Sequence, residues 1–262
     1  TVSLAPVANT SLTGVVLDPG IDLAPGTRDD VLAGPDGALR TADDQYLTPL
    51  AGVKVFILGL EDQAVFTDAQ GRFTLANVPV GNVKIAVDGR TATNAPQGFY
   101  FPEMVMDATL EAGRVNTVMG SQGTVQDRIA NASRPEVYLP RLRTDILQAV
   151  TAEATTLVGV RPEAAPDLTA AQREQLTIEV QAGSLVGTDG GKLDQAQVGI
   201  SMVPPELVRD MLPPGVLQHT FDITVQAPGV DRFSTPAPMT FPNVFNAAPG
   251  TQLSFLSFDH TT

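Results

Sequence analysis

The sequence predicts an all-β protein made of two antiparallel β-sandwich domains, with long loops and one or two short helices. Three observations favour this class. The 262 residues include 23 Gly and 21 Pro, which supply many turns. Short stretches in which polar and apolar residues alternate recur at a spacing of about ten residues, as in sandwich folds. The chain is also long enough for two domains, each with its own core.

The composition narrows the possible functions. Hydrophobic residues make up 43% of the chain, which is normal for a globular protein. The net charge of −13 argues against nucleic acids and anionic membrane surfaces as partners, because both require a basic face. There is no Cys, so disulfides and thiolate metal sites are excluded. No apolar run approaches the roughly 18 residues of a membrane span, and we expect no direct membrane insertion.

The rest of the chain is organised around an acidic loop. Residues 1–12 read as an extended lead, and the apolar stretch 12–17 is a first strand that enters the loop. The loop, residues 18–44, contains no Glu, and only Arg28 and Arg40 offset its seven aspartates. A strong strand at 50–58 fixes its far end. The seven acids are Asp18, Asp22, Asp29, Asp30, Asp36, Asp43 and Asp44.

Aspartates at this density repel one another, so a folded loop needs a countercharge. Calcium takes roughly six to eight oxygen ligands, and short Asp side chains between Gly turns suit it. The spacing is not that of an EF-hand, which has acids at alternate positions and a closing Glu. We therefore expect the loop to be folded by calcium. A solvated acidic loop is the alternative reading.

Turn signals divide the following stretch into hairpins. Asp68–Gly71 separates a strand at 65–67 from one at 72–75, and a turn near 77–81 leads to alternation over 82–87. Another strand-turn-strand segment covers 110–116. The aromatic triplet at 99–101 is expected to pack as a core plug or an interdomain contact rather than to bind a ligand. A polar loop at 121–133 ends the first domain, which we place at 13–133.

Residues 12–90 resemble a carboxypeptidase-regulatory or Cna-B-like domain, and within that fold the calcium-binding B repeats of bacterial surface adhesins. The resemblance rests on Pro49–Val53, Thr67–Phe73 and Val78–Gly81. It implies an immunoglobulin-like or prealbumin-like sandwich in which the loop after the first strand binds calcium. The leading ligands that it implies are Asp18, Asp22, Asp36, Asp43 and Asp44. Asp29 and Asp30 belong to a loop that is longer than the usual repeat.

Many Cna-B domains also form a Lys–Asn isopeptide bond with the help of a buried acid. Here the segment 75–79, before the final turn, has no acid. We therefore expect Lys54 and Lys84 to be solvent-facing strand residues at alternating positions.

The second half begins with a connecting segment at 134–175. It contains a strand at 137–142, a stretch at 145–156 that fits strand or helix, and a short helix at 167–175. Thr169 and Gln172 match a capping box at the start of that helix. From 176 the pattern is β again, with an Asp-Gly turn at 188–192 and one helical turn at 204–210. The strands are expected at 177–180, 196–203, 220–225 and 253–259.

Residues 176–262 are similar to a ZU5-like β-sandwich, of the kind found near YD or Rhs repeats in giant secreted bacterial proteins. The matching pieces are residues 233–243 and 249–260. The resemblance implies a domain that continues beyond Thr262. Some ZU5 domains cleave themselves at a His-Phe-Ser motif, but residues 219–221 read His-Thr-Phe, so that activity is not carried over.

The motifs of common enzyme classes are missing. A catalytic zinc site needs three protein ligands, whereas the chain has only His219 and His260. It has no Gly-x-Ser-x-Gly elbow, P-loop or Rossmann fingerprint. With no Trp and three Tyr, the chain has few aromatic rings on which a sugar could stack. The sequence predicts a protein that is not an enzyme.

These observations predict a calcium-stabilised structural module of a bacterial extracellular or cell-surface protein, such as an adhesin, stalk or fibre subunit. Its partners would be neighbouring domains or identical subunits, and the lead at 1–12 could add a strand to a neighbour's sheet. One alternative is a plug or linker segment of a giant Rhs-like or teneurin-like secreted protein. Another is a carbohydrate-binding or hydrolytic module, against which the shortage of aromatic residues argues.

Overall fold

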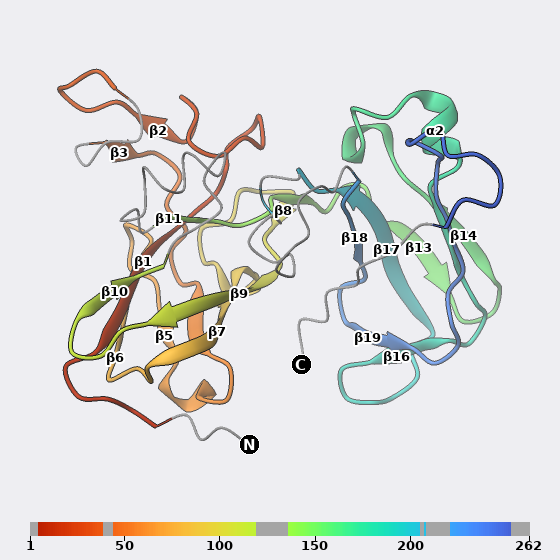
Figure 1. Ribbon diagram of the computed structural model, residues 1–262. Helices are drawn as coiled ribbons and strands as arrows, with labels where there is room; N and C mark the ends of the chain where they lie inside the picture. The colour runs from red at the N-terminus through yellow and green to blue at the C-terminus, as the bar shows by residue number, and fades with distance from the viewer. Residues whose placement is uncertain (1–4, 39–43, 119–135, 205–206, 208–220, 253–262) are drawn as a thin grey trace. The chain divides into compact units, whose positions relative to one another are not determined.

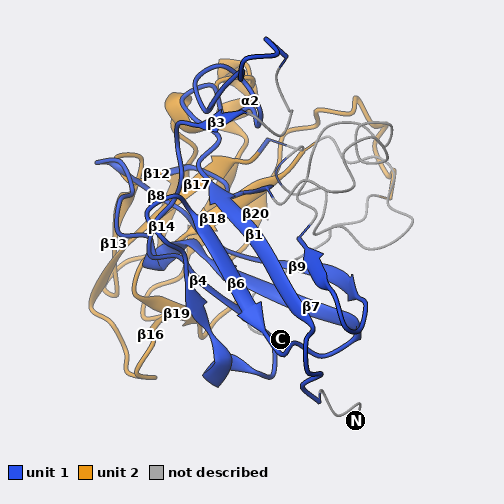
Figure 2. Ribbon diagram, turned by 90° about the vertical axis from the view of Figure 1, so that its left-hand side faces the viewer, with its two compact units in different colours: residues 1–142, 204–219, 257–262 blue, residues 143–203, 220–256 orange. Residues whose placement is uncertain are grey.

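The computed structural model describes residues 5–38, 44–118, 136–204, 207 and 221–252. They form β-strands with short 3-10 turns and the α-helix α2, so the all-β prediction is confirmed (Figure 1). The chain divides into two compact units (Figure 2). Unit 1 contains Thr1–Leu142, Pro204–His219 and Ser257–Thr262, and unit 2 contains Arg143–Val203 and Thr220–Leu256.

The first sheet of unit 1 is built around β1, whose side chains at Leu12, Val16 and Leu17 are fully buried. β1 pairs antiparallel with β6 but parallel with β10 and β11, so this sheet departs from the antiparallel arrangement expected from the sequence. Neither parallel partner is next to β1 in the chain, and strand-turn-strand spacing predicts only pairing between neighbours. The strands are β1 (Ser11–Leu17), β6 (Arg72–Ala76), β10 (Val115–Thr117) and β11 (Glu136–Tyr138).

The second sheet of unit 1 is antiparallel throughout, in the order β5-β4-β7-β9. Its longest pairing joins β7 to β9, from Gly81 opposite Leu110 to Asp88 opposite Glu103. Lys84 on β7 is exposed and Lys54 on β4 is half-buried. The strands are β4 (Lys54–Ile57), β5 (Val65–Phe66), β7 (Gly81–Asp88) and β9 (Glu103–Leu110).

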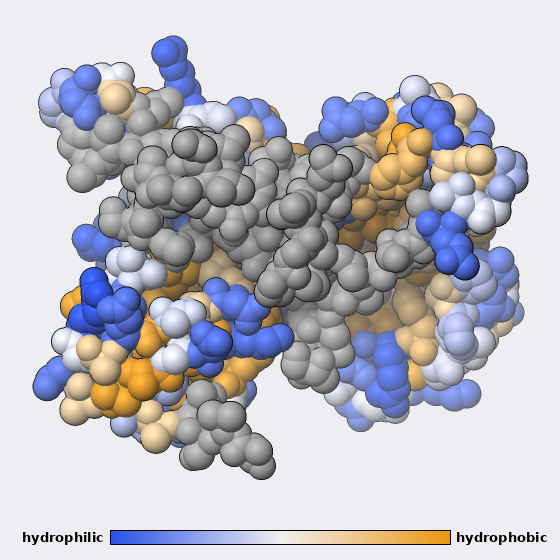
Figure 3. All heavy atoms as spheres, viewed as in Figure 1, coloured by the Kyte–Doolittle hydropathy of each residue, from blue (hydrophilic) through white to orange (hydrophobic). Residues whose placement is uncertain are grey.

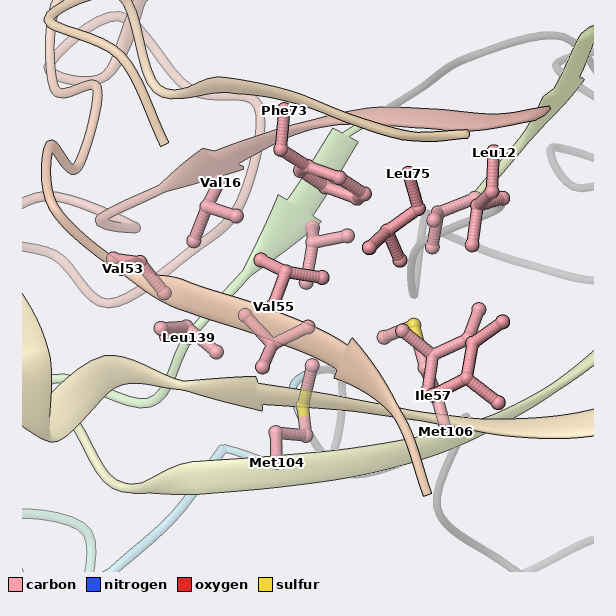
Figure 4. Packing of buried hydrophobic residues seen from close by; sticks show 14 of the residues in the cluster. Leu12, Val16, Val53, Val55, Ile57, Phe73, Leu75, Met104, Met106 and Leu139 are labelled. Carbon is pink, nitrogen blue, oxygen red and sulfur yellow. The ribbon is translucent and has the colours of Figure 1, made fainter. Parts of the chain in front are cut away.

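The core of unit 1 lies between these two sheets (Figure 4). Alternation places Phe73 and Leu75 of β6 on the buried face, with exposed residues between them. Met104 and Met106 of β9 face them from the other sheet. Of the aromatic triplet at 99–101, Phe101 is fully buried in this core, as expected for a core plug, whereas Phe99 and Tyr100 are half-buried. Unit 1 is therefore sandwich-like, with its apolar residues between two sheets.

The extended lead expected over residues 1–12 is not free at its C-terminal end. Ser11 and Leu12 belong to β1, and the amide of Val7 donates a hydrogen bond to the carbonyl oxygen of Val78 at 3.3 Å. Burial of the Leu12 side chain explains why the sheet begins this early.

Unit 2 has its own core and three small antiparallel sheets, in the orders β13-β17-β18, β14-β15-β20 and β16-β19. Its strands are β13 (Gln148–Thr151), β14 (Thr156–Gly159), β15 (Thr177–Val180), β16 (Leu185–Gly187), β17 (Gln195–Met202), β18 (Ile223–Gln226), β19 (Val230–Phe233) and β20 (Met239–Thr240).

Residues 134–175 differ from the connecting segment that the sequence suggests. They supply β11 to unit 1, and β13, β14 and α2 (Ala170–Glu174) to unit 2. The stretch 145–156, which fits strand or helix in the sequence, contains β13 and the first residue of β14, and the fully buried Val150 and Val158 of these two strands lie in the core. Pairing with β17 and β15 therefore makes this stretch β, an effect that local propensity does not include.

Local turn and cap chemistry agrees with the sequence. The capping box is present: Gln172 N donates to Thr169 Oγ1 at 3.3 Å, and Thr169 N donates to Gln172 Oε1 at 2.9 Å. Gly71 and Gly190 take positive φ in the two predicted turns. The remaining elements are β2 (Val31–Leu32), β3 (Gln45–Tyr46), β8 (Phe99–Tyr100), β12 (Leu142–Arg143), and the 3-10 turns η1 (Glu61–Gln63), η2 (Gly89–Thr91) and η3 (Pro162–Ala164).

Some expectations lie outside the described residues. These are the polar loop at 121–133, most of the helical turn at 204–210 and the strand at 253–259. No helix of the described chain is long and apolar enough to cross a membrane.

Candidate functional site

The acidic loop starts where β1 ends and is tied back to the sheet by backbone hydrogen bonds. The amide of Asp18 donates to the carbonyl oxygen of Thr48 at 2.9 Å, and the amide of Leu47 donates to that of Asp30 at 2.8 Å. Inside the loop, β2 pairs antiparallel with β3. Asp43 lies outside the described residues, and the other six predicted ligands lie within them. In Figure 3, hydrophilic residues, with apolar ones among them, are seen at the upper left, where Figure 1 shows the loop.

Asp18 is at the root of the loop and is 3% exposed. Its Oδ1 accepts a hydrogen bond from the Gly20 amide at 3.0 Å, and its Oδ2 lies 3.5 Å from Nη1 of Arg141. The Arg141 guanidinium also lies 4.1 Å from the ring centre of Phe99. Burial raises the pKa of Asp18, and it outweighs the opposing effects of Arg141 and of the Gly20 amide. The charged partner of this acid is therefore Arg141, which lies near the end of the segment Thr1–Leu142 of unit 1.

Asp29 organises the turn that follows. Its Oδ2 accepts from the amides of Ile21 at 2.6 Å and Asp22 at 3.3 Å, and its Oδ1 accepts from the Thr27 hydroxyl. Burial raises the pKa of Asp29, but the hydrogen bonds from Thr27 and the two amides together hold it below its usual value. Gly20 has a φ of +81°, and a Cβ there would overlap the Asp29 carboxylate. The turn therefore requires Gly at position 20.

Asp30 is fully buried, although it is adjacent to Asp29. Its Oδ2 accepts from the Gly26 amide at 2.9 Å. Burial raises its pKa to about 6, while the Gly26 amide and the Tyr138 hydroxyl act in the opposite direction. Among the described residues, Asp30 Oδ1 and the Tyr138 hydroxyl oxygen have no partner with hydrogen-bond geometry. This acid carries a large desolvation penalty that its present contacts only partly offset.

Strand β11 supplies the polar groups under the loop. Tyr138 is fully buried, and burial raises its pKa, as do the nearby Glu136 and Asp30. Glu136 is 3% exposed, and its Oε1 accepts from the Tyr46 hydroxyl at 2.7 Å. Because Tyr46 belongs to β3, this bond ties the far end of the loop to the sheet.

The six described aspartates fall into two groups. The inner aspartates, Asp18, Asp29 and Asp30, are bound to the root of the loop as described above. The outer aspartates are Asp22, Asp36 and Asp44. Asp22 is exposed and accepts from the Ala24 amide at 2.9 Å, and its Oδ2 lies 3.0 Å from the Thr27 hydroxyl oxygen that donates to Asp29. Asp36 is exposed and accepts from the Ala38 amide at 2.8 Å. Asp44 is half-buried.

The described aspartates do not converge on one point. Within the part of the chain that the structure describes, no group of three or more Asp, Glu or His side chains is placed to hold a metal ion. The reason is local. A short Asp side chain readily accepts from an amide two residues ahead, as Asp18, Asp22 and Asp36 all do, and each therefore faces its own turn. The described carboxylates alone do not fit a calcium site of six or more oxygen ligands.

Sequence reasoning missed the residues that hold the loop, namely Glu136, Tyr138 and Arg141, together with Thr48. Their separation from Asp18 in the chain hides the contact. One signal was available. Arg141 is the one charged residue within the otherwise apolar stretch 137–142, and a charge in such a place usually has a buried partner.

Unit 2 carries one aromatic feature of its own. Phe221 and Phe241 meet edge to face, with ring centres 6.3 Å apart. They line a shallow apolar hollow together with Phe245, which is 52% exposed, and with Pro242 and Pro249. Among the residues that the structure describes, no charged side chain lines it. His219 and His260 lie outside the described residues.

Comparison with known proteins leaves the family open. No protein-family model matches the chain, and no curated protein matches it. One solved structure that it resembles is the TIE protein of Bacillus anthracis, with 12% sequence identity and a TM-score of 0.26. The match covers 89% of this chain and 28% of that one, so the chain spans less than a third of the TIE structure. A superposition this loose carries no argument, and both family resemblances stay predictions.

Proposed function

We propose that this chain is a non-enzymatic structural module of a bacterial extracellular or cell-surface protein, and that its acidic loop is a fixed part of the folded domain. The observation that carries the proposal is the buried pair of Asp18 and Arg141, whose side chains are 5% and 10% exposed. A charge pair this deep has to be assembled as the domain folds, because either group alone would be costly to bury. Its partners would be neighbouring domains or identical subunits.

Calcium is the second part of the proposal. Asp29 raises the pKa of both Asp18 and Asp30, which indicates that the acids of the loop repel one another. A divalent cation at the outer aspartates and Asp43 would lower the negative charge of the loop as a whole, and its ligands would rearrange when it binds. Binding to the folded state alone would add about 2.7 kcal/mol at a hundredfold excess over Kd.

Thermal unfolding in calcium, magnesium and EDTA tests the calcium part. A gain of about 2.7 kcal/mol corresponds to roughly 5–10 °C for a unit of this size. We expect that shift with calcium only, and we expect the double variant Asp36→Asn, Asp43→Asn to lose it. Asp62→Asn, at an exposed acid of η1 outside the loop, is the matched control. Equal melting temperatures in calcium and EDTA would remove calcium from the proposal.

Limited proteolysis tests the structural part separately. A loop held by Asp18, Arg141 and β11 should resist the added protease between residues 19 and 38 even in EDTA, because its backbone is bonded to the sheet. Rapid cleavage there in both calcium and EDTA would contradict a fixed loop and leave a solvated insertion. The alternative of a plug or linker segment in a giant Rhs-like protein shares these outcomes. It is distinguished by YD repeats downstream in the full gene.

A further inference from the structure

The peptide bond between Asp18 and Pro19 occupies an unusual position. It is the only Asp–Pro bond in the 262-residue sequence. It follows directly on β1, and Asp18, Pro19 and Gly20 are all buried. The bond is therefore shielded from bulk water, although it borders a loop whose outer part is exposed.

Thr48 holds the carbonyl group of this bond. Its hydroxyl donates a hydrogen bond to the Asp18 carbonyl oxygen at 2.6 Å, and its own carbonyl oxygen accepts from the Asp18 amide at 2.9 Å. The two contacts fix the Asp18 backbone and polarise its carbonyl. A hydroxyl in this position resembles the donors that stabilise the oxyanion in acyl transfer, which lie about 2.7–3.1 Å from the oxygen that becomes charged.

The Asp18 side chain is fixed as well. Its Oδ1 accepts from the Gly20 amide at 3.0 Å and its Oδ2 lies 3.5 Å from Arg141. Asp29 holds the turn at Gly20 in place, because its carboxylate accepts hydrogen bonds from the amides of Ile21 and Asp22. The carboxyl group therefore stays beside its own main-chain carbonyl, and attack on that carbon closes a five-membered ring. Such fixed proximity is a large source of rate enhancement.

We propose that the Asp18 carboxyl group cleaves the Asp18–Pro19 peptide bond in the folded protein. A carboxyl oxygen forms a bond to the Asp18 carbonyl carbon, and the electron pair of the C–N bond leaves on the Pro19 nitrogen, which takes up the carboxyl proton. The products are a cyclic anhydride at residue 18 and a secondary amine at Pro19. One water molecule then opens the anhydride to two carboxyl groups, so the net reaction is hydrolysis.

Proline suits the leaving position. Its nitrogen belongs to a tertiary amide and carries no hydrogen, and on cleavage it becomes a secondary amine that binds a proton readily. Thr48 supplies the donor to the developing oxyanion. The reaction happens once per chain, so it is compatible with a structural module and does not rest on the proposed function.

The cleaved chain would stay assembled. Residues 11–17 form β1, which is bonded to β6, β10 and β11 and buries Leu12, Val16 and Leu17 completely. Cleavage therefore converts β1 into a strand that is held only by non-covalent contacts. The fragment 1–18 separates on denaturation but not under native conditions.

Mass spectrometry of the purified full chain tests the proposal. Under denaturing conditions we expect fragments 1–18 and 19–262, whose masses sum to the intact chain plus one water, and under native conditions a single assembled species. Hydroxylamine should trap the anhydride as a hydroxamate at the new C-terminus of fragment 1–18. The sequence has no Asn–Gly bond, so hydroxylamine has no such site at which to cut.

Four variants separate the chemistry from folding. Pro19→Ala leaves the partners of every Asp18 contact described above in place and should slow cleavage, because the leaving nitrogen is then that of an ordinary secondary amide. Thr48→Val should slow it by roughly 100-fold, the lower end of the effect of deleting one oxyanion donor, and Thr48→Ser should restore it. Asp18→Ala should abolish it. The proposal is overturned if the folded wild-type chain stays intact over days, if it is cleaved no faster than the urea-unfolded chain, or if Thr48→Val and Thr48→Ser behave alike.

Discussion

The inner and outer aspartates belong to one loop, yet they are bound in different ways. The inner three are fixed by the fold: Asp18 pairs with Arg141, Asp29 accepts from two amides and a hydroxyl, and Asp30 is fully buried. Of the outer three, Asp22 and Asp36 are exposed and accept from groups within their own turns. The same residue type therefore contributes to folding at the root of the loop and lies in exposed turns farther out.

Removing Arg141 should cause the largest loss of stability. Arg141→Met leaves the Asp18 carboxylate buried without its ion-pair partner, which typically costs about 3–5 kcal/mol. Urea unfolding followed by tyrosine fluorescence measures this loss for unit 1 alone. The chain has no Trp, and its three tyrosines all belong to unit 1, namely Tyr46, Tyr100 and Tyr138.

A pair on the surface of the same unit is the control. Arg72 and Asp68 are 3.0 Å apart, with side chains that are 63% and 45% exposed. Arg72→Met should cost no more than about 1 kcal/mol, because solvent screens the pair. If both variants lose similar stability, the Asp18–Arg141 pair does not anchor the loop.

Two glycines with similar positive φ angles are expected to give the next largest loss of stability. Gly20 and Gly37 have φ of +81° and +71°. A Cβ at position 20 would overlap Asp29, whereas one at position 37 would have no atom within 4 Å. Gly37→Ala should therefore cost only the left-handed strain of about 1–2 kcal/mol, and Gly20→Ala about 2–4 kcal/mol. Equal losses in urea unfolding would show that Asp29 moves aside freely.

The local features of this fold could be predicted from sequence because their causes are local. Gly71 closes the turn that begins at Asp68 with a φ of +72°, which glycine adopts without strain, and the residues after it alternate as strands do. The capping box at Thr169 needs only four residues. The acidic loop was also placed correctly between two strands, β1 and β4.

The partners of the inner aspartates could not be predicted in this way. Arg141 and Tyr138 reach Asp18 and Asp30 only because β11 pairs parallel with β1, with Tyr138 opposite Leu17. That pairing joins segments more than a hundred residues apart, and no turn or periodicity in the sequence encodes it. The sequence therefore predicts that the acids need a countercharge, but not that an arginine of the same domain supplies part of it.

Adjacent inner aspartates should have opposite pH dependence. The pKa of Asp30 rises from 3.8 to about 6 on folding, so the folded state binds this proton more tightly. Its contribution to stability is complete below about pH 4 and is lost as the pH rises through 6. At about 1.4 kcal/mol per pKa unit, unit 1 should gain about 1–3 kcal/mol from this group between pH 7.5 and 4. Asp30→Asn should remove that gain.

Asp29 provides the comparison for this measurement. Its pKa is lowered on folding, so its contribution is present above its ordinary pKa and is lost as the pH falls through the folded value. The unfolding free energy that wild type has in excess of Asp29→Asn should therefore decrease as the pH falls, which is opposite to the trend for Asp30. The decrease should occur at a lower pH than the change for Asp30. Parallel slopes for the two variants would contradict the assigned environments.

Substitutions of the outer aspartates are expected to change the stability of unit 1 least. Asp36 is exposed, and its hydrogen bond to the Ala38 amide is one that an Asn side chain can also accept. Asp36→Asn should therefore change the stability of unit 1 by no more than about 0.5 kcal/mol in EDTA, as is usual for surface substitutions. In calcium the same variant should lose part of the stabilisation that the wild type gains, because one ligand has lost its charge. A substantial loss already in EDTA would mean that Asp36 supports the fold as the inner aspartates do, and the division of the loop into two groups would then be wrong.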